Sequence, residues 1–128
     1  MDKKRITLIP NLGKKNKNGR IYSEELANEI INNNKELFGQ IGHPDNAYVD
    51  DLTKLSHKVK NFTIENNSLV GDVEYLETPP GHNARVSLPA LGWVCRPRGY
   101  GSVDEDGNIS DYKIIAFDLI EKSTDSFE

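Results

Sequence analysis

Three features of the sequence hold residue types that take part in acyl transfer. They are the tripeptide Gly42-His43-Pro44, the stretch 93–103 with its arginines and glycines, and Asp118 within an apolar run. A histidine at a strand end, a nucleophile on a neighbouring strand and a buried carboxylate are the parts of a catalytic triad. In that arrangement His43 is the base, Asp118 orients it, and backbone N–H groups near the glycines stabilise the oxyanion.

Each histidine and carboxylate also has a purely structural interpretation. The ring of His43 can form a local hydrogen bond in a turn, and Asp118 can be a strand-end carboxylate paired with Arg96 or Arg98. His57 lies between a serine and a lysine, which favours a solvated strand face, and His82 lies in a loop rich in proline and glycine. Neither of these last two histidines is expected to be functional.

Composition excludes several classes of protein. The chain of 128 residues carries a net charge of −4 and has a pI near 5.4, which argues against the basic face of a nucleic-acid-binding protein. Its single cysteine, Cys95, and three separated histidines predict no disulfide, metal or other cofactor. With no apolar run of about 20 residues, and no export signal in the first residues, we expect a protein that is neither membrane-bound nor exported.

The first half of the chain predicts two short strands and one helix. Residues 6–9 are β-branched and stop at a proline, and the polar stretch 11–20 has little to bury. A serine N-cap followed by two glutamates and an apolar stripe predicts a helix over 23–33. Residues 38–42 predict a strand that delivers His43 onto a loop, because a residue before proline avoids the helical region.

The second half predicts mainly strands. Residues 55–64 and 69–76 form a hairpin around a turn of glutamate, asparagines and serine. A short helix is expected over 83–88 and a strand over 93–95, and residues 112–120 resemble a strand buried on both faces. Six or seven short strands with one or two helices predict a single α+β domain over 1–128, rich in β structure, with a closed or nearly closed sheet.

The order of these features resembles the prohead core proteases of tailed bacteriophages, which share a fold with the herpesvirus assemblins. The resemblance covers about residues 5–125. It is carried by Gly19-Arg20-Ile21-Tyr22 before the first helix, Gln40-Ile41-Gly42-His43-Pro44, the hairpin step Gly71-Asp72-Val73, Arg98-Gly99-Tyr100-Gly101-Ser102-Val103, and Phe117-Asp118-Leu119-Ile120 followed by Ser123. It implies a peptidase that cleaves scaffold and capsid proteins, with His43 as the catalytic histidine and Asp118 as its partner.

The sequence departs from that family at the nucleophile. Alignment on Arg98-Gly99 places Arg96 and Pro97 where the family has a pair of serines, and neither residue can attack a carbonyl. The family's proline before Ser123 is also absent. Two replacements are conceivable: Cys95, one position earlier and therefore expected to face the other side of the strand, and Ser102, four residues downstream of Arg98.

Three hypotheses follow. The first is a non-catalytic phage head protein, a pseudoenzyme that binds capsid or scaffold proteins, with Arg96 and Arg98 recognising carboxylates of a neighbouring subunit. The second is an active maturation peptidase of the serine or cysteine type. The third is an unrelated β-rich binding module with contact aromatics at Trp93, Tyr100 and Tyr112. The first two imply the host bacterial cytoplasm during assembly and then the virion head, and they allow a homo-oligomer.

Overall fold

Six strands and two helices make up the described part of the chain. The structure is a computed structural model, and it describes residues 3–45 and 51–127. The elements in chain order are β1 (Lys3–Ile9), α1 (Glu24–Asn33), β2 (Glu36–Gln40), β3 (Leu55–Glu65), β4 (Ser68–Tyr75), α2 (Pro79–Ala90), β5 (Val94–Val103) and β6 (Ile109–Ile120), and a 3₁₀ turn at Lys122–Thr124 follows. The α+β class rich in strands is as predicted from the sequence.

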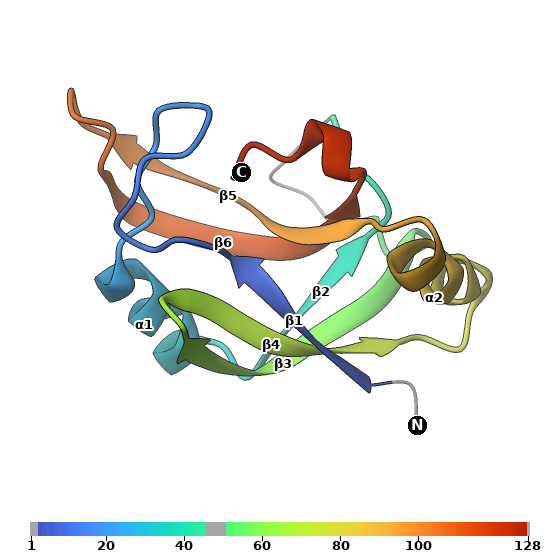
Figure 1. Ribbon diagram of the computed structural model, residues 1–128. Coiled ribbons are helices and arrows are strands. Elements are labelled where there is room, and N and C mark those ends of the chain that lie inside the picture. Colours follow the sequence, from blue (N-terminus) through green and yellow to red (C-terminus); the bar gives the residue numbers. More distant parts are fainter. Residues whose placement is uncertain (1–2, 46–50, 128) are drawn as a thin grey trace.

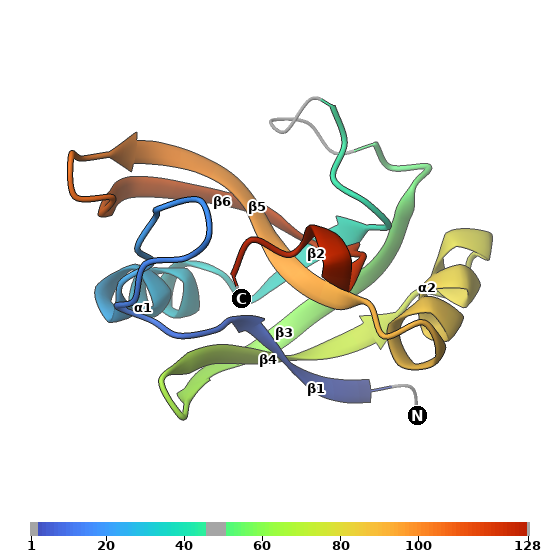
Figure 2. The same cartoon turned by 45° about the horizontal axis from the view of Figure 1, so that its top comes forward.

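The strands form two antiparallel sheets. Four strands pair in the order β1-β4-β3-β2, and β5 pairs with β6 in a long hairpin. The hairpin lies across one face of the larger sheet, and α1 and α2 lie at opposite ends of the molecule (Figures 1 and 2). The apolar core fills the space between these layers and includes Phe117 of β6 and Leu8 of β1, both fully buried.

The expected closed sheet is not formed in the described residues. The two sheets meet at one side, where Ile41 forms a parallel bridge with Leu119 and the Gly42 N–H donates to the Leu119 carbonyl at 2.6 Å. At the other side, β5 and β1 remain in separate sheets. The Arg96 side chain spans this seam, since its Nη1 donates to the Thr7 carbonyl of β1 at 3.0 Å. A side chain therefore makes a connection that a continuous backbone ladder would make in a closed barrel.

Local sequence signals explain where most elements begin and end. Ser23 caps α1 by accepting from the Leu26 N–H at 3.0 Å, so the helix predicted over 23–33 is confirmed. The turn of the β3–β4 hairpin places Asn66 and Asn67 at φ +50° and +62°, a conformation that asparagine tolerates. The second helix is longer than predicted because it begins at a Thr78 cap, with prolines in its first turn where no amide donor is needed.

One glycine allows the strands to pack closely beneath the site. A Cβ built on Gly39 of β2 would lie 1.8 Å from the Phe117 carbonyl oxygen and 2.6 Å from Nε2 of His57. No side chain fits there, because such distances are far inside van der Waals contact. Gly39 therefore lets β2 pack closely against β6, next to the His57 ring.

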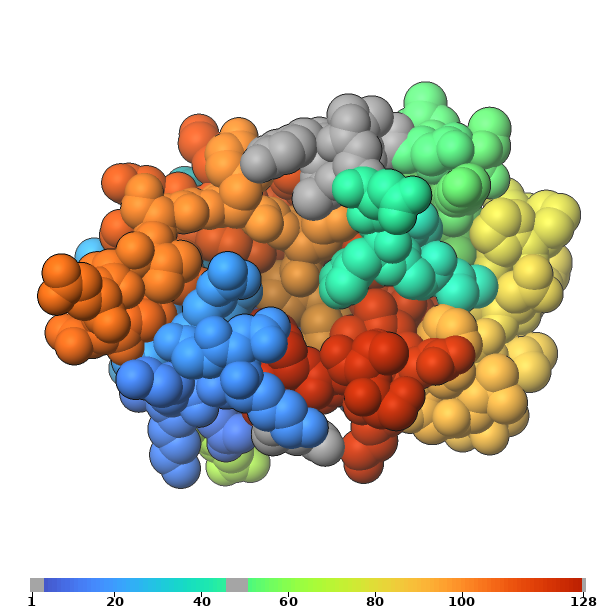
Figure 3. Space-filling model, turned by 90° about the horizontal axis from the view of Figure 1, so that it is seen from above, coloured from blue at the N-terminus to red at the C-terminus, as the bar shows by residue number. Residues whose placement is uncertain are grey.

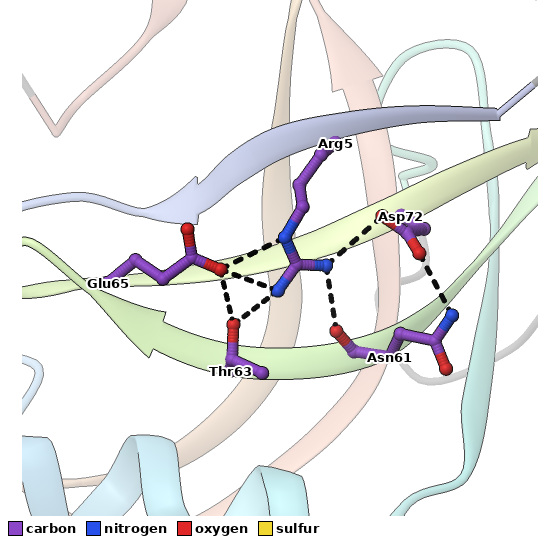
Figure 4. Close-up of polar contacts among 5 residues, drawn as sticks. All are labelled: Arg5, Asn61, Thr63, Glu65 and Asp72. Carbon is purple, nitrogen blue, oxygen red and sulfur yellow. Dashed lines mark hydrogen bonds and ion pairs between the residues drawn. The ribbon is translucent and has the colours of Figure 1, made fainter.

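The solvent-facing side of the larger sheet carries a polar network centred on Arg5 (Figure 4). Its guanidinium donates to Glu65 at 2.7 and 3.0 Å, to Asp72 at 3.1 Å and to the Asn61 carbonyl at 3.0 Å, and it also contacts the Thr63 hydroxyl. These contacts tie β1 to the β3–β4 hairpin. Because the network is exposed, solvent screens each ion pair and keeps its contribution to stability small.

Candidate functional site

The structure brings His43 and Asp118 into direct contact although 75 positions separate them. The Ile41–Leu119 bridge carries the end of β2 alongside β6, and Gly42 turns the chain at φ +78°. The His43 Nδ1 then lies 2.8 Å from Oδ2 of Asp118. Since Nδ1 is bound to the carboxylate, Nε2 is directed away from it. The histidine side chain is 40% exposed whereas the carboxylate is fully buried, which is the arrangement of a base and its orienting acid.

Three groups form hydrogen bonds with the Asp118 carboxylate: the His43 ring, the Gln40 amide and the Arg98 guanidinium. The Gln40 N–H donates to Oδ1 at 3.0 Å, and Arg98 donates through Nε to Oδ2 at 2.6 Å and through Nη2 to Oδ1 at 3.3 Å. Burial by itself raises the pKa of Asp118, but the hydrogen bonds with His43, Arg98 and the Gln40 amide outweigh it and leave the pKa lowered. Asp118 therefore forms both the ion pair with Arg98 that its structural interpretation expects and the contact with His43.

His57 is buried, so its predicted place on a solvated strand face is wrong. Its Nε2 lies 2.7 Å from the Phe117 carbonyl and its Nδ1 lies 2.7 Å from the Ser56 hydroxyl. Because a carbonyl only accepts, Nε2 carries the proton and Nδ1 accepts from the hydroxyl. Burial lowers the pKa of His57, although the Phe117 carbonyl and the charge of Asp118 act in the opposite direction. Through its hydrogen bond to the Phe117 carbonyl, this neutral ring fixes the backbone one residue before Asp118. The sequence did not reveal the burial of His57 because the adjacent Lys58 indicates a solvated strand face.

The structure places the two candidate replacements for the nucleophile in the apolar core and near the tip of a hairpin. Cys95 is 1% exposed and belongs to the apolar core, and burial strongly raises the pKa of its thiol. A buried protonated thiol is a poor nucleophile. Ser102 is exposed and pairs with Ser110 near the tip of the β5–β6 hairpin. With about 3.3 Å per residue along a strand, it lies roughly 13 Å from Arg98, which contacts Asp118.

Both guanidiniums in this region bind carboxylates of the same chain. Arg98 binds Asp118 as described, and Arg96 binds Asp125 through Nε at 3.0 Å and Nη2 at 2.9 Å. The Arg96 Nη1 also donates to the Cys95 carbonyl at 2.9 Å. The side chains of both arginines are nearly fully buried. They are thus engaged internally, in contrast to the expected role of binding a neighbouring subunit.

A groove of about 380 Å³ runs beside His43. Residues from five segments line it, and they include Asn16, Asn18, Arg20, Tyr22, His43, Pro44, Arg96, Pro97, Arg98, Gly99, Tyr112, Thr124, Ser126 and Phe127. Figure 3 shows this face, where a hollow with orange β5 atoms at its floor is bordered by the blue loop 11–20, the teal residues around 43 and the red C-terminal residues. The half-exposed His43 side chain is therefore part of the lining of this groove.

Residues 3–45 and 51–127 contain neither a cluster of metal ligands nor a membrane-spanning helix. No three histidine, cysteine, aspartate or glutamate side chains gather there as ligands for a metal ion. None of the helices in this part of the chain has the length and apolarity to cross a membrane.

Comparison with known proteins identifies the fold. No protein-family model and no curated protein sequence matches the chain. A solved structure that is similar is that of the bacteriophage T4 capsid assembly protease, gp21, with 20% sequence identity and a TM-score of 0.73 over 92% of this chain and 80% of that chain. At this identity the likeness shows the fold alone. With its elements in the order that the sequence resemblance predicts, the chain has a prohead-protease-like fold.

Proposed function

We propose that this chain is a bacteriophage head protein that keeps the prohead-protease fold, has lost proteolysis, and binds capsid or scaffold proteins. The fold supports this proposal because the similar T4 protein is a capsid assembly protease. In this proposal the protein works in the host bacterial cytoplasm during assembly and remains in the virion head. Its partners are proteins, not nucleic acid or membrane.

The feature that supports the proposal most is the alignment on Arg98-Gly99, which places Arg96 and Pro97 where the prohead proteases have their pair of serines. Proline has no side-chain nucleophile, and a guanidinium stays protonated near neutral pH. Arg96 is also committed to a bidentate pair with the buried Asp125. Within the described residues, the Arg96 guanidinium forms four hydrogen bonds with Asp125, Thr7 and Cys95, so this side chain is part of the packing of the fold.

One observation favours the alternative of an active maturation peptidase, namely the 2.8 Å contact between His43 and Asp118. Two features weigh against it. Arg98 already neutralises the carboxylate that would stabilise a charged imidazole, and Cys95 faces the core. The same His43–Asp118 contact, together with the fold, argues against the unrelated β-rich binding module.

The test combines the purified chain with the capsid and scaffold proteins of its phage. Sedimentation measures association, and gel electrophoresis with mass spectrometry measures cleavage. We expect full-length partners to sediment with the chain, and we expect the wild type and His43→Ala to behave alike. Cleavage that disappears in His43→Ala would establish the peptidase instead, and absence of co-sedimentation would overturn the binding role.

Copy number in purified virions gives a second readout of the same proposal. Intact chains at a number comparable with the capsid lattice are expected of a structural component. Chains that are absent or fragmented would point to a protease that digests itself during maturation.

A further inference from the structure

The residues after β6 fold back over β5 and are anchored by a buried carboxylate. Asp125 is 2% exposed, and its two oxygens accept from Nε and Nη2 of Arg96 at 3.0 and 2.9 Å. Such a planar two-point contact selects a carboxylate over a neutral side chain. The anchor is therefore a specific carboxylate site and not a diffuse charge contact.

An aromatic side chain two positions later fills the neighbouring space. Phe127 is 8% exposed, and its ring centroid lies 4.9 Å from that of Tyr22. The Arg96 guanidinium carbon lies 5.8 Å from the centroid of the Phe127 ring. The backbone between the two anchors is also fixed, since the Lys17 N–H donates to the Ser126 carbonyl at 2.8 Å. A carboxylate clamp, an aromatic pocket and a backbone hydrogen bond are the usual components of a peptide-binding site.

This segment borders the groove that contains His43. Thr124, Ser126 and Phe127 line one side of the groove, and His43 lies on its wall. The red residues in Figure 3 accordingly lie between the blue loop 11–20 and the teal residues near 43. The site that holds the chain's own segment is therefore adjacent to the groove and open to it along this side.

We propose that Arg96 is the specificity determinant of a peptide-binding site beside this groove that accepts an acidic residue followed two positions later by an aromatic one, and that residues 124–127 fill this site in cis. A buried guanidinium without a partner is strongly unfavourable, so a peptide that displaces the segment must supply another carboxylate. The proposal is independent of the phage-head role, because it concerns only the peptide chemistry of this site.

The test removes the anchors of residues 124–127 in the full-length chain and adds the same segment as a separate peptide. The double variant Asp125→Asn/Phe127→Ala removes both anchors and keeps the volume at position 125. The probe is a fluorescein-labelled peptide of residues 121–127 with blocked ends, and the matched control is the same peptide with asparagine in place of the aspartate. Fluorescence anisotropy measures both affinities, and circular dichroism checks that the variant is folded.

We expect the double variant to bind the acidic peptide at least about tenfold more tightly than the asparagine peptide. Wild-type protein should bind the acidic peptide much more weakly, because its own segment competes at an effective concentration on the order of millimolar. Adding Arg96→Lys should reduce the discrimination between the two peptides, since lysine lacks the bidentate geometry.

A folded double variant that binds neither peptide, or binds both equally, would overturn the proposal. If the double variant does not fold, Phe127→Ala alone keeps the Arg96 anchor and serves in its place. It should bind the acidic peptide more tightly than the wild type does, and equal binding would overturn the proposal. Because no phage protein enters this experiment, its outcome is separate from that of the sedimentation test.

Discussion

Lowering the pH from 7 to 5 should destabilise the protein through His57. The ring is fully buried and burial lowers its pKa, whereas in the unfolded chain a histidine titrates near pH ~6.5. Below that pH the unfolded state therefore binds a proton that the folded state does not. The free energy of unfolding then falls as the pH falls, by up to about 1.4 kcal/mol per pH unit.

The expected magnitude follows from the hydrogen bonds of the ring. With Nδ1 accepting from Ser56 and Nε2 donating to Phe117, both ring nitrogens are hydrogen-bonded in the neutral form, and burial disfavours a second proton. If only the unfolded state titrates between pH 7 and 5, the stability contribution lost is about 2 kcal/mol. This contribution is fully present above about pH 6.5 and declines below it.

Urea unfolding followed by the fluorescence of Trp93, the single tryptophan, measures this effect at pH 5, 6 and 7. The control is His57→Gln, whose amide can donate to the same carbonyl but does not titrate. The loss between pH 7 and 5 should be about 2 kcal/mol smaller in the variant than in the wild type. Equal losses in the two proteins, or a wild type that gains stability on acidification, would refute the assignment of a buried neutral ring.

Three further predictions concern residues around the site. Arg96→Ser should cost about 3–5 kcal/mol in urea unfolding because it removes the cation that pairs with the buried Asp125 carboxylate, and Arg96→Ser/Asp125→Ser should recover part of that loss. Cys95 should react with iodoacetamide roughly 100-fold more slowly in the native protein than in urea, and a native rate as fast as in urea would contradict its place in the core. Gly39→Ala should cost at least about 4 kcal/mol, since the new Cβ would lie 1.8 Å from a carbonyl oxygen of β6, whereas Gly13→Ala at φ +83° has open space and should cost only about 1–2 kcal/mol.

Local signals in the sequence account for several elements and for their order. The helix at 23–33 and the β3–β4 hairpin follow from a serine cap, an apolar stripe and a turn of asparagines, all of which act over neighbouring residues. The same local reading located His43 after a strand end and Asp118 within a buried strand. Their order along the chain, with the spacing of the flanking motifs, was enough to predict the prohead-protease-like fold.

The tertiary structure decided which distant groups meet. Arg96 and Asp125 are 29 positions apart, and nothing in the residues near either one selects the other. The burial of His57 depends on the approach of β6 over Gly39, which a pattern within β3 does not contain. Likewise, whether two sheets close into a barrel depends on how the β5–β6 hairpin lies against β1. Local propensities specify the elements, but pairing between them depends on the path of the whole chain, and that path brings Asp125 to Arg96.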